Sequence, residues 1–448
     1  MSVPAVVPGP RVTGTPGMMT SVTTRPAGDL PHEDSLEPVA LIRQSGTVLR
    51  TGRDMLAAGT GSFRVKTAMQ QVARAVGLDR HEAHVTLTEI TATSHRGPIF
   101  RTEVTEARRI GVDANRLAEL TRMCDALQPG TTVDDVDREL DRIEALRALY
   151  PPLLNALFAA VACGAFAYLN NGGPIEVLGV ALAAGLGQAV RRAMLHRAIN
   201  QFGTTMVAAA VASLVYLGFA VALEAVVGPG ASHQAGYVSA VLFLVPGFAL
   251  VTGALDLAKL DFSAGIARTV YANVILVSAG VSVWAVSWVA GLHPAALPPV
   301  PAPLAVELAL RAVASGLGVL GFALLFNSPV RMALGAAGIG AVANVLRLQL
   351  VDAGLAVQAA TMIATLVVGL LAAWVAPRLR VPRITVSVPA VVIMVPGAAA
   401  YRAVVGLNDG DAGTTFAAGA QALFVVVSIA VGLAAARMLT DRDWAYER

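Results

Sequence analysis

Long apolar stretches dominate the chain from residue 151 onward. We count ten of them, and each is close to the roughly 20 residues that an α-helix needs to cross the hydrocarbon core of a bilayer. They cover residues 153–170, 174–190, 203–224, 237–255, 266–290, 304–326, 329–350, 355–376, 386–405 and 414–436. This pattern predicts a multi-pass α-helical membrane protein with ten transmembrane helices.

The residues before this region are more polar. Residues 1–35 are rich in Pro, Gly, Thr and Ser and have no apolar period, so we expect a disordered tail. Residues 36–150 combine helix-like and strand-like periods, which predicts a small α+β domain. The predicted helices cover 39–59, 65–77, 117–127 and, after the cap Thr132, 133–150, and the predicted strands cover 84–93 and 99–104.

The same dipeptide interrupts two of the apolar stretches. Pro396-Gly397 lies in the ninth stretch, and Pro246-Gly247 lies 150 residues earlier in the fourth. A proline inside a helix leaves a carbonyl without its hydrogen bond, and lipid cannot supply one. Paired breaks of this kind in matching halves indicate the binding site of a transporter. We therefore expect these four residues to contact a substrate.

The two halves of the apolar region share further positions. A shift of 156 residues aligns Gln188 with Asn344, and a shift of 150 aligns Asp261 with Asp411. Because five is an odd number of spans, the second half would enter the membrane from the opposite side. The sequence thus predicts a 5+5 inverted repeat, with residues 151–290 as the first five-helix unit and 291–440 as the second.

Charge divides the chain in the same way as hydropathy. Of 448 residues, 55% are hydrophobic, and residues 1–150 hold 18 of the 33 basic and 19 of the 30 acidic side chains. After residue 150, 12 of the 15 basic residues lie on one side of the predicted helices. The positive-inside rule assigns that side, both termini and the tail 441–448 to the cytoplasm. The predicted location is the cytoplasmic membrane.

Composition also limits the partners. The net charge of +3 is too small to suggest nucleic acid, and no metal-ligand spacing occurs. Cys124 and Cys163 fall in different regions, so we expect no disulfide. His84 and His95 flank a predicted strand without a paired Ser or Cys nucleophile, so we predict no catalytic residue and no enzyme. The expected partners are the lipid bilayer and a small amino-acid solute, and we expect no metal or cofactor. The sequence does not decide whether the protein forms a homo-oligomer.

Arg402 and Tyr401 follow the second break. An arginine inside a membrane span is costly and marks a functional site, and its guanidinium can bind a carboxylate through two parallel hydrogen bonds. The alternative is that Arg402 lies near the outer end of its span and extends its charge to the interface. Thr252, the equivalent position in the first half, is uncharged. We therefore expect a single carboxylate anchor.

Two further sets of polar residues are candidates. Amides that we expect to be buried could hold a polar substrate, or could simply join helices; they are Gln188, Asn344, Asn273 and Gln421. Charged residues near span ends could gate the path or couple protons, or could belong to ordinary solvated loops; they are Asp256, Asp261, Arg268, Asp409 and Asp411.

The residues from Pro396 to Arg402, followed by Leu407-Asn408-Asp409, resemble the signature of the threonine/serine exporter family. Weaker similarity covers Gly61-Ser62, His84-Val85 and the pair Asp256 and Arg268. The resemblance implies an inner-membrane exporter of L-threonine, L-serine and similar amino acids, with ten spans, a cytoplasmic N-terminal domain and the proton-motive force as its drive. Pro246-Gly247 has no place in the family pattern and rests on internal symmetry alone.

Other functions stay open at this point. Relatives in this family, some split into two subunits, export other small carboxylates, so a dicarboxylate exporter is one alternative. A membrane-anchored hydrolase acting through the N-terminal domain and a passive channel are two more. The chain has no Gly-x-x-x-x-Gly-Lys-Ser/Thr motif, so we expect an ion gradient rather than a nucleotide to drive transport.

Overall fold

The computed structural model describes residues 39–107, 111–227, 236–291 and 303–446. The predicted disordered tail, 1–35, and the side chain of Tyr401 lie outside the described part.

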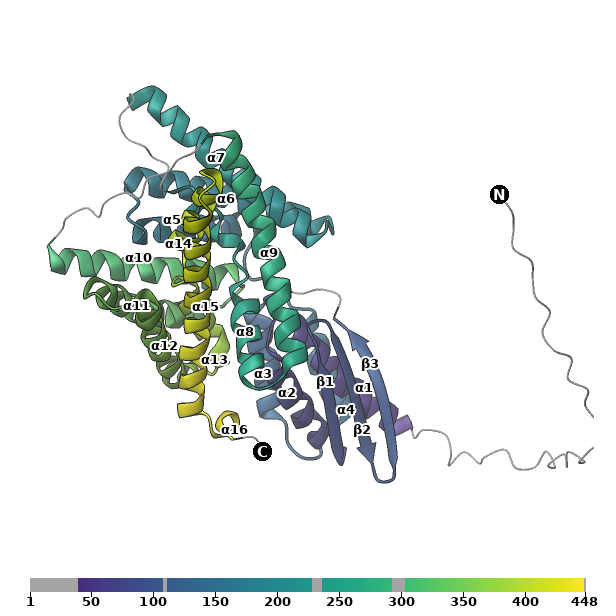
Figure 1. Cartoon of the computed structure of the whole chain (residues 1–448). Coiled ribbons are helices and arrows are strands. Elements are labelled where there is room, and N and C mark those ends of the chain that lie inside the picture. Colours follow the sequence, from purple (N-terminus) through teal and green to yellow (C-terminus); the bar gives the residue numbers. More distant parts are fainter. Residues whose placement is uncertain (1–38, 108–110, 228–235, 292–302, 447–448) are drawn as a thin grey trace, which may run out of the picture.

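Four helices and three strands form the N-terminal unit, which we define as residues 39–144. The helices are α1 (Val39–Ala57), α2 (Ser62–Ala75), α3 (Ala114–Ala126) and α4 (Val133–Glu144), and the antiparallel strands are β1 (Arg80–Val85), β2 (Glu89–Arg96) and β3 (Ile99–Glu106). Leu41, Val48 and Met55 recur at every seventh position of α1 and are at most 3% exposed. This buried face lets α1, with α2, cover one face of the sheet (Figure 1).

Two predicted boundaries in this unit are wrong. The predicted strand 84–93 is two strands, β1 and β2, because the chain turns after Thr86. Its backbone N–H donates to the Glu89 carbonyl at 2.8 Å, and its hydroxyl accepts the Glu89 N–H at 3.0 Å. A threonine that bonds its neighbouring backbone in this way favours a turn, which the alternating pattern hid. The last helix ends at Glu144 rather than residue 150.

Among the residues that the structure describes, the apolar region contains eight long helices. They are α5 (Pro152–Leu169), α6 (Pro174–His196), α7 (Gln201–Val227), α9 (Phe262–Val289), α10 (Leu304–Leu325), α11 (Val330–Asp352), α12 (Val357–Leu379) and α15 (Ala412–Thr440). Within the described ranges, seven helices are long and apolar enough to cross a membrane: all of these except the more polar α6.

The remaining two apolar stretches are interrupted, as predicted. The fourth is a 3₁₀ helix, η3 (Ser239–Leu244), followed by α8 (Gly247–Ala258). The ninth is α13 (Arg383–Val392) followed by α14 (Gly397–Asn408). In both, Pro-Gly stands at the interruption, and glycine is the first residue of the new helix.

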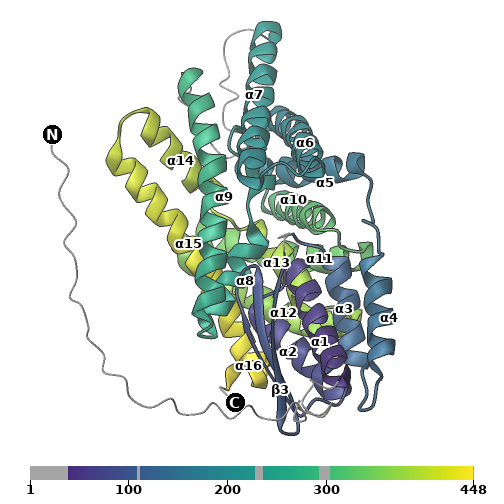
Figure 2. The same ribbon diagram turned by 90° about the vertical axis from the view of Figure 1, so that its right-hand side faces the viewer.

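Three turns of the first half have counterparts in the second. Asn171 and Asn327, Ala198 and Gly354, and Leu260 and Gly410 all have positive φ angles, between 56° and 91°. The first two pairs are 156 residues apart and the third is 150 apart, the same shifts that align the sequence. The α8–α9 turn lies beside the N-terminal unit, whereas the α14–α15 turn lies at the far side of the structure (Figures 1 and 2).

The N-terminal unit is attached to the α10–α11 turn. The side chain of Asn327 donates from Nδ2 to Asp113 Oδ1 at 2.8 Å and accepts the Leu149 N–H at Oδ1, also at 2.8 Å. Beside it, the Ala114 N–H at the start of α3 donates to the Phe326 carbonyl at 3.0 Å. The positive φ of Asn327 leaves its side chain and the neighbouring carbonyl facing α3.

Candidate functional site

The two Pro-Gly breaks have the same local geometry. The Gly247 N–H donates to the Val245 carbonyl at 2.9 Å, and the Gly397 N–H donates to the Val395 carbonyl at 2.8 Å. A bond across one residue closes an inverse γ-turn, and Pro246, with φ −80° and ψ 60°, has the angles of its central residue. Each turn redirects the chain between two short helices.

The breaks also lie against one another. A Cβ on Gly247 would come within 2.5 Å of Val392 Cγ2, at the end of α13, and one on Gly397 would come within 2.8 Å of the Phe166 ring. Between them is a cavity of about 20 Å³ whose lining is apolar, including Leu250 and Val391. Valine, leucine and isoleucine side chains surround this cavity, and the substrate contact expected of the four Pro-Gly residues stays a prediction.

Polar groups gather farther along α8. We call Thr252, Asp256 and Arg268 the Asp256 cluster. Arg268, from α9, places Nε 3.1 Å from Asp256 Oδ2 and Nη1 3.5 Å from Thr252 Oγ1, and all three residues are at most 3% exposed. Gly253 and Gly265 make this possible, since a Cβ on either would meet the facing helix at 3.1 Å or closer. The first half thus also has a buried arginine beside Thr252, supplied by the next helix, whereas the single carboxylate anchor stays a prediction.

The N-terminal unit reaches the same cluster. The Ser62 N–H, at the start of α2, donates to both oxygens of Asp256, at 3.0 and 3.2 Å. Ser62 Oγ and Lys66 Nζ both bond Asp261 Oδ2. Burial raises the pKa of the Asp261 carboxyl, but the bonds from Lys66 and Ser62 outweigh it and hold that pKa below its ordinary value.

Arg402 lies on the other side of the structure, on α14. Its Nη2 donates to Gln421 Oε1 of α15 at 2.8 Å, so two predicted substrate residues are brought together; we call them the Arg402 pair. Arg402 is exposed. Asp411 caps α15 by accepting the Thr414 N–H at 3.0 Å, and Asp409 is exposed in the same turn.

The predicted amides divide into two kinds. Gln188 donates to Asn155 at 2.7 Å and Asn344 donates to Ser315 at 2.8 Å, and both are buried between helices. Asn273 is exposed and donates to the Thr269 carbonyl of its own helix, so its predicted burial is wrong. An apolar stretch does not reveal which of its helix faces points outward.

Sequence reasoning missed Glu176. It lies in the first turn of α6 and is only 5% exposed. An acid inside an apolar stretch is itself a signal of function, and Glu176 lies inside the predicted span 174–190.

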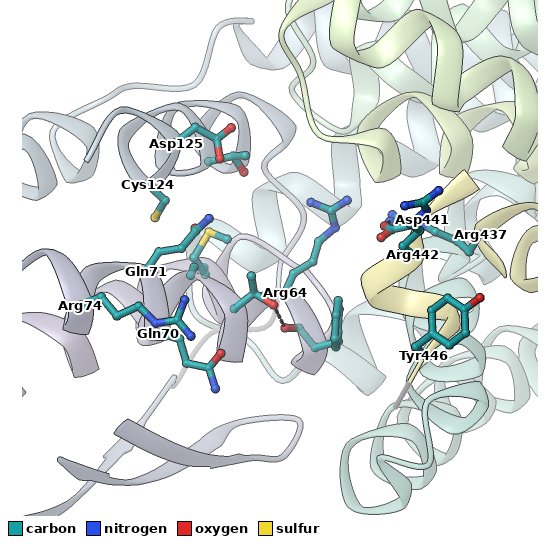
Figure 3. A pocket seen from close by; sticks show the side chains of 15 residues that line it. Arg64, Gln70, Gln71, Arg74, Cys124, Asp125, Arg437, Asp441, Arg442 and Tyr446 are labelled. Carbon is teal, nitrogen blue, oxygen red and sulfur yellow. Dashed lines mark hydrogen bonds and ion pairs between the residues drawn. The ribbon is translucent and has the colours of Figure 1, made fainter. Parts of the chain in front are cut away.

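A large cavity opens between the N-terminal unit and the C-terminal helices α15 and α16 (Arg442–Ala445). Its volume is about 880 Å³, and four arginines but only two aspartates line it: Arg64, Arg74, Arg437 and Arg442 with Asp125 and Asp441. We call it the arginine-lined cavity. Figure 3 shows Arg64 reaching from α2 into the space between α3 and the C-terminal helices. Burial, and next the charge of Arg437, lower the pKa of Arg64 from its ordinary value, so a bound anion would relieve an unfavourable charge.

Comparison with known proteins assigns most of the chain. A family model described as "Putative threonine/serine exporter" matches residues 46–289, and one described as "Threonine/Serine exporter, ThrE" matches residues 311–439. No solved structure matches.

Curated relatives include two kinds of transporter. The chain is 26% identical over 383 residues to the "Probable threonine/serine exporter" of Mycobacterium tuberculosis, covering 80% of this chain and 68% of the relative. It is 24% identical over 231 residues to the "Probable succinate transporter subunit YjjP" of Klebsiella aerogenes, covering 51% and 87%. The Escherichia coli protein of the same name is 25% identical over 241 residues, covering 52% and 90%. With one family model matching more than half of its length, this chain belongs to the threonine/serine exporter family.

Proposed function

We propose that this protein is a secondary transporter that exports small polar amino acids, L-threonine and L-serine, across the cytoplasmic membrane, driven by the proton-motive force. The observation that carries this proposal is the pair of identical γ-turn breaks that lie against one another at the centre of the apolar region. Short helices that end at such breaks can reorient without disturbing the long helices around them, as alternating access requires.

A 5+5 inverted repeat of ten spans is part of the proposal. The matching turns at shifts of 156 and 150 residues support it, as does the placement of the α8–α9 and α14–α15 turns at opposite sides (Figure 1). Arg191 and Arg347 add to this, since each donates to the amide three residues before it, Gln188 or Asn344. In this arrangement the Asp256 cluster faces the cytoplasmic side and the Arg402 pair faces the outer side.

We assign the N-terminal unit to the cytoplasm as a soluble α+β domain. The basic residues around it, including Arg331, Arg378 and Arg383, favour that side. A reporter enzyme that works only outside the cytoplasmic membrane should therefore be inactive when fused after Arg448 and active when inserted in the segment 292–302. The reverse pattern would overturn the orientation.

The substrate is tested by efflux from proteoliposomes. Loaded with radiolabelled L-serine, L-threonine or succinate, vesicles with the purified protein should release the amino acids faster than protein-free vesicles. A proton gradient should accelerate release, and a protonophore should abolish that acceleration. Counterflow against unlabelled amino acid distinguishes a carrier from a channel, because a channel cannot concentrate label. Release independent of the proton gradient would contradict the proposed drive.

A dicarboxylate exporter is the second candidate, favoured by the surplus of arginine in the arginine-lined cavity and by relatives named as succinate transporter subunits. Faster release of succinate than of serine in the same vesicles would support it over the amino-acid proposal.

Proton coupling is assigned to carboxylates of the Asp256 cluster and its neighbours. Asp256 is buried and Asp261 is bonded to the N-terminal unit, whereas Asp409 and Asp411 lie exposed at the other side. A buried carboxylate near an arginine can change its charge as the arrangement around it changes, which is what coupling to protons requires.

A further inference from the structure

The guanidinium of Arg268 has unused hydrogen-bonding capacity. Its side chain is 4% exposed, yet among the described residues neither Nε nor Nη2 has a hydrogen-bond partner; Nε is near Asp256 without hydrogen-bond geometry. Buried N–H groups of a charged side chain are costly to leave unpaired. A partner that is absent from this arrangement would relieve that cost, and a carboxylate matches the guanidinium best.

Asp256, by contrast, has a hydrogen-bond donor from the N-terminal unit in addition to its ion pair with Arg268. Both of its oxygens accept the Ser62 N–H. A Cβ on Gly61 would be 2.9 Å from Asp256 Oδ1, so only glycine allows α2 to approach this closely. The start of α2 therefore supplies, at Asp256, the N–H donors that a substrate ammonium group would supply.

The space around the Asp256 cluster is nearly closed. A cavity of about 30 Å³ lined by Gly61, Phe63, Thr252 and Asp256 adjoins it, enough for one water molecule but not for an amino acid. Phe63, Arg64 and Arg437 line both this cavity and the arginine-lined cavity of about 880 Å³. A solute in the large cavity is thus separated from Asp256 by the first turn of α2.

We propose that Asp256, Arg268 and Thr252 form a binding site for a zwitterionic amino acid and that the first turn of α2 occupies it as a plug. This inference rests on the proposed function and names the site that it uses on the cytoplasmic side. When α2 withdraws, Asp256 accepts the substrate ammonium in place of the Ser62 N–H, Nη2 of Arg268 donates to the substrate carboxylate, and the Thr252 hydroxyl is close to both.

The plug is tested without any need for transport. Ser62 is the first residue of α2, where proline is well tolerated, and Gly61 has the extended angles, φ −72° and ψ 160°, that a residue before proline adopts. Ser62→Pro therefore removes the N–H that binds Asp256 and keeps the helix. Ser62→Ala is the matched control, because it keeps the N–H and loses only the hydroxyl that bonds Asp261.

Access is read from a cysteine at Leu255, which lines the 30 Å³ cavity, after replacing Cys124 and Cys163 with alanine in the full chain. Maleimide should label Leu255→Cys about tenfold faster with Ser62→Pro than with Ser62→Ala, the effect of losing one hydrogen bond to a charged group. Equal labelling rates in the two variants would overturn the plug.

Occupancy is read from protection of the same cysteine in the Ser62→Pro protein. L-serine should protect this cysteine. Serinamide, which lacks the carboxylate, should protect it much less, and so should glycerate, which lacks the ammonium. Arg268→Lys should raise the half-protecting concentration of L-serine about tenfold but hardly change that of serinamide. Asp256→Asn should also raise the half-protecting concentration of L-serine about tenfold, but hardly change the half-protecting concentration of glycerate.

The failures are distinguishable. If L-serine protects equally in the Ser62→Pro protein with and without Arg268→Lys or Asp256→Asn, while the wild-type protein exports serine, this site is wrong and the proposed function stands. If serine neither protects nor is exported, both are wrong.

Discussion

Gly247→Leu and Gly397→Leu are expected to abolish amino-acid export while leaving membrane insertion intact. A Cβ at Gly247 would lie 2.5 Å from Val392 Cγ2, and one at Gly397 would lie 2.8 Å from the Phe166 ring. Both neighbours are stiff side chains in the packed centre. Overpacking of this kind costs about 1–3 kcal/mol, and because the breaks must shift during transport the export rate should fall by about fivefold to a hundredfold. The export rate of each variant is measured as efflux of radiolabelled L-serine from proteoliposomes, normalised to the amount of inserted protein.

Matched controls separate this effect from a general intolerance to leucine. Gly280 and Gly338 lie within α9 and α11, and a Cβ at either has no neighbour within 4 Å. Gly280→Leu and Gly338→Leu should therefore export at wild-type rates. Gly247→Ala places the same Cβ against Val392 and should also reduce export. Adding Val392→Ala to it should restore export, because this removes the methyl group that the new Cβ meets. Wild-type efflux from both Gly247→Leu and Gly397→Leu would mean that the breaks are only structural kinks.

The breaks show which part of the site the sequence could predict. A proline cannot donate a backbone hydrogen bond, which favours an interruption at Pro246 and Pro396. Proline alone does not decide it, since Pro377 and Pro389 lie inside α12 and α13; at both breaks a glycine follows the proline and begins the next helix. The positions of the interruptions and the resemblance to the exporter family follow from local sequence. What fills the space between the breaks does not, because it depends on how Val392 and Phe166 pack from other parts of the chain.

Contacts between distant segments account for most of what was missed. Arg268 lies beside Thr252 because two helices approach through Gly253 and Gly265, and a comparison of aligned positions cannot detect a partner from the neighbouring helix. Ser62 meets Asp256 across 194 residues of sequence. The sequence predicts a buried Asn273 although this residue is exposed, since its helix is apolar on all faces and shows no periodicity.

Arg402 is expected to decide recognition of the carboxylate on the outer side. Its Nη2 donates to the neutral Gln421 side chain, a partner that a carboxylate can replace with a stronger, charge-assisted bond. Such bonds contribute about 1.5–3 kcal/mol, so Arg402→Ala should weaken apparent affinity for external L-serine by about tenfold to a hundredfold. Arg402→Lys keeps the charge but not the planar pair of donors, and should lose a smaller part.

The measurement is counterflow with L-serine or serinamide supplied from outside. The wild-type protein should prefer L-serine, and Arg402→Ala should lose that preference while inserting normally. Arg378→Ala is the matched control: Arg378 is also exposed, but its guanidinium lies 3.9 Å over the Trp374 ring and has the position of an interfacial anchor. It should leave the preference unchanged. If Arg402→Ala retains the wild-type preference, then Arg402, like Arg378, only extends its charge to the interface, and the carboxylate is bound elsewhere. Suppose instead that the preference for L-serine over serinamide falls in Arg402→Ala for external substrate and in Arg268→Lys for substrate from the cytoplasmic side. The two arginines then bind the substrate carboxylate on opposite sides of the breaks, as expected of the two halves of an inverted repeat.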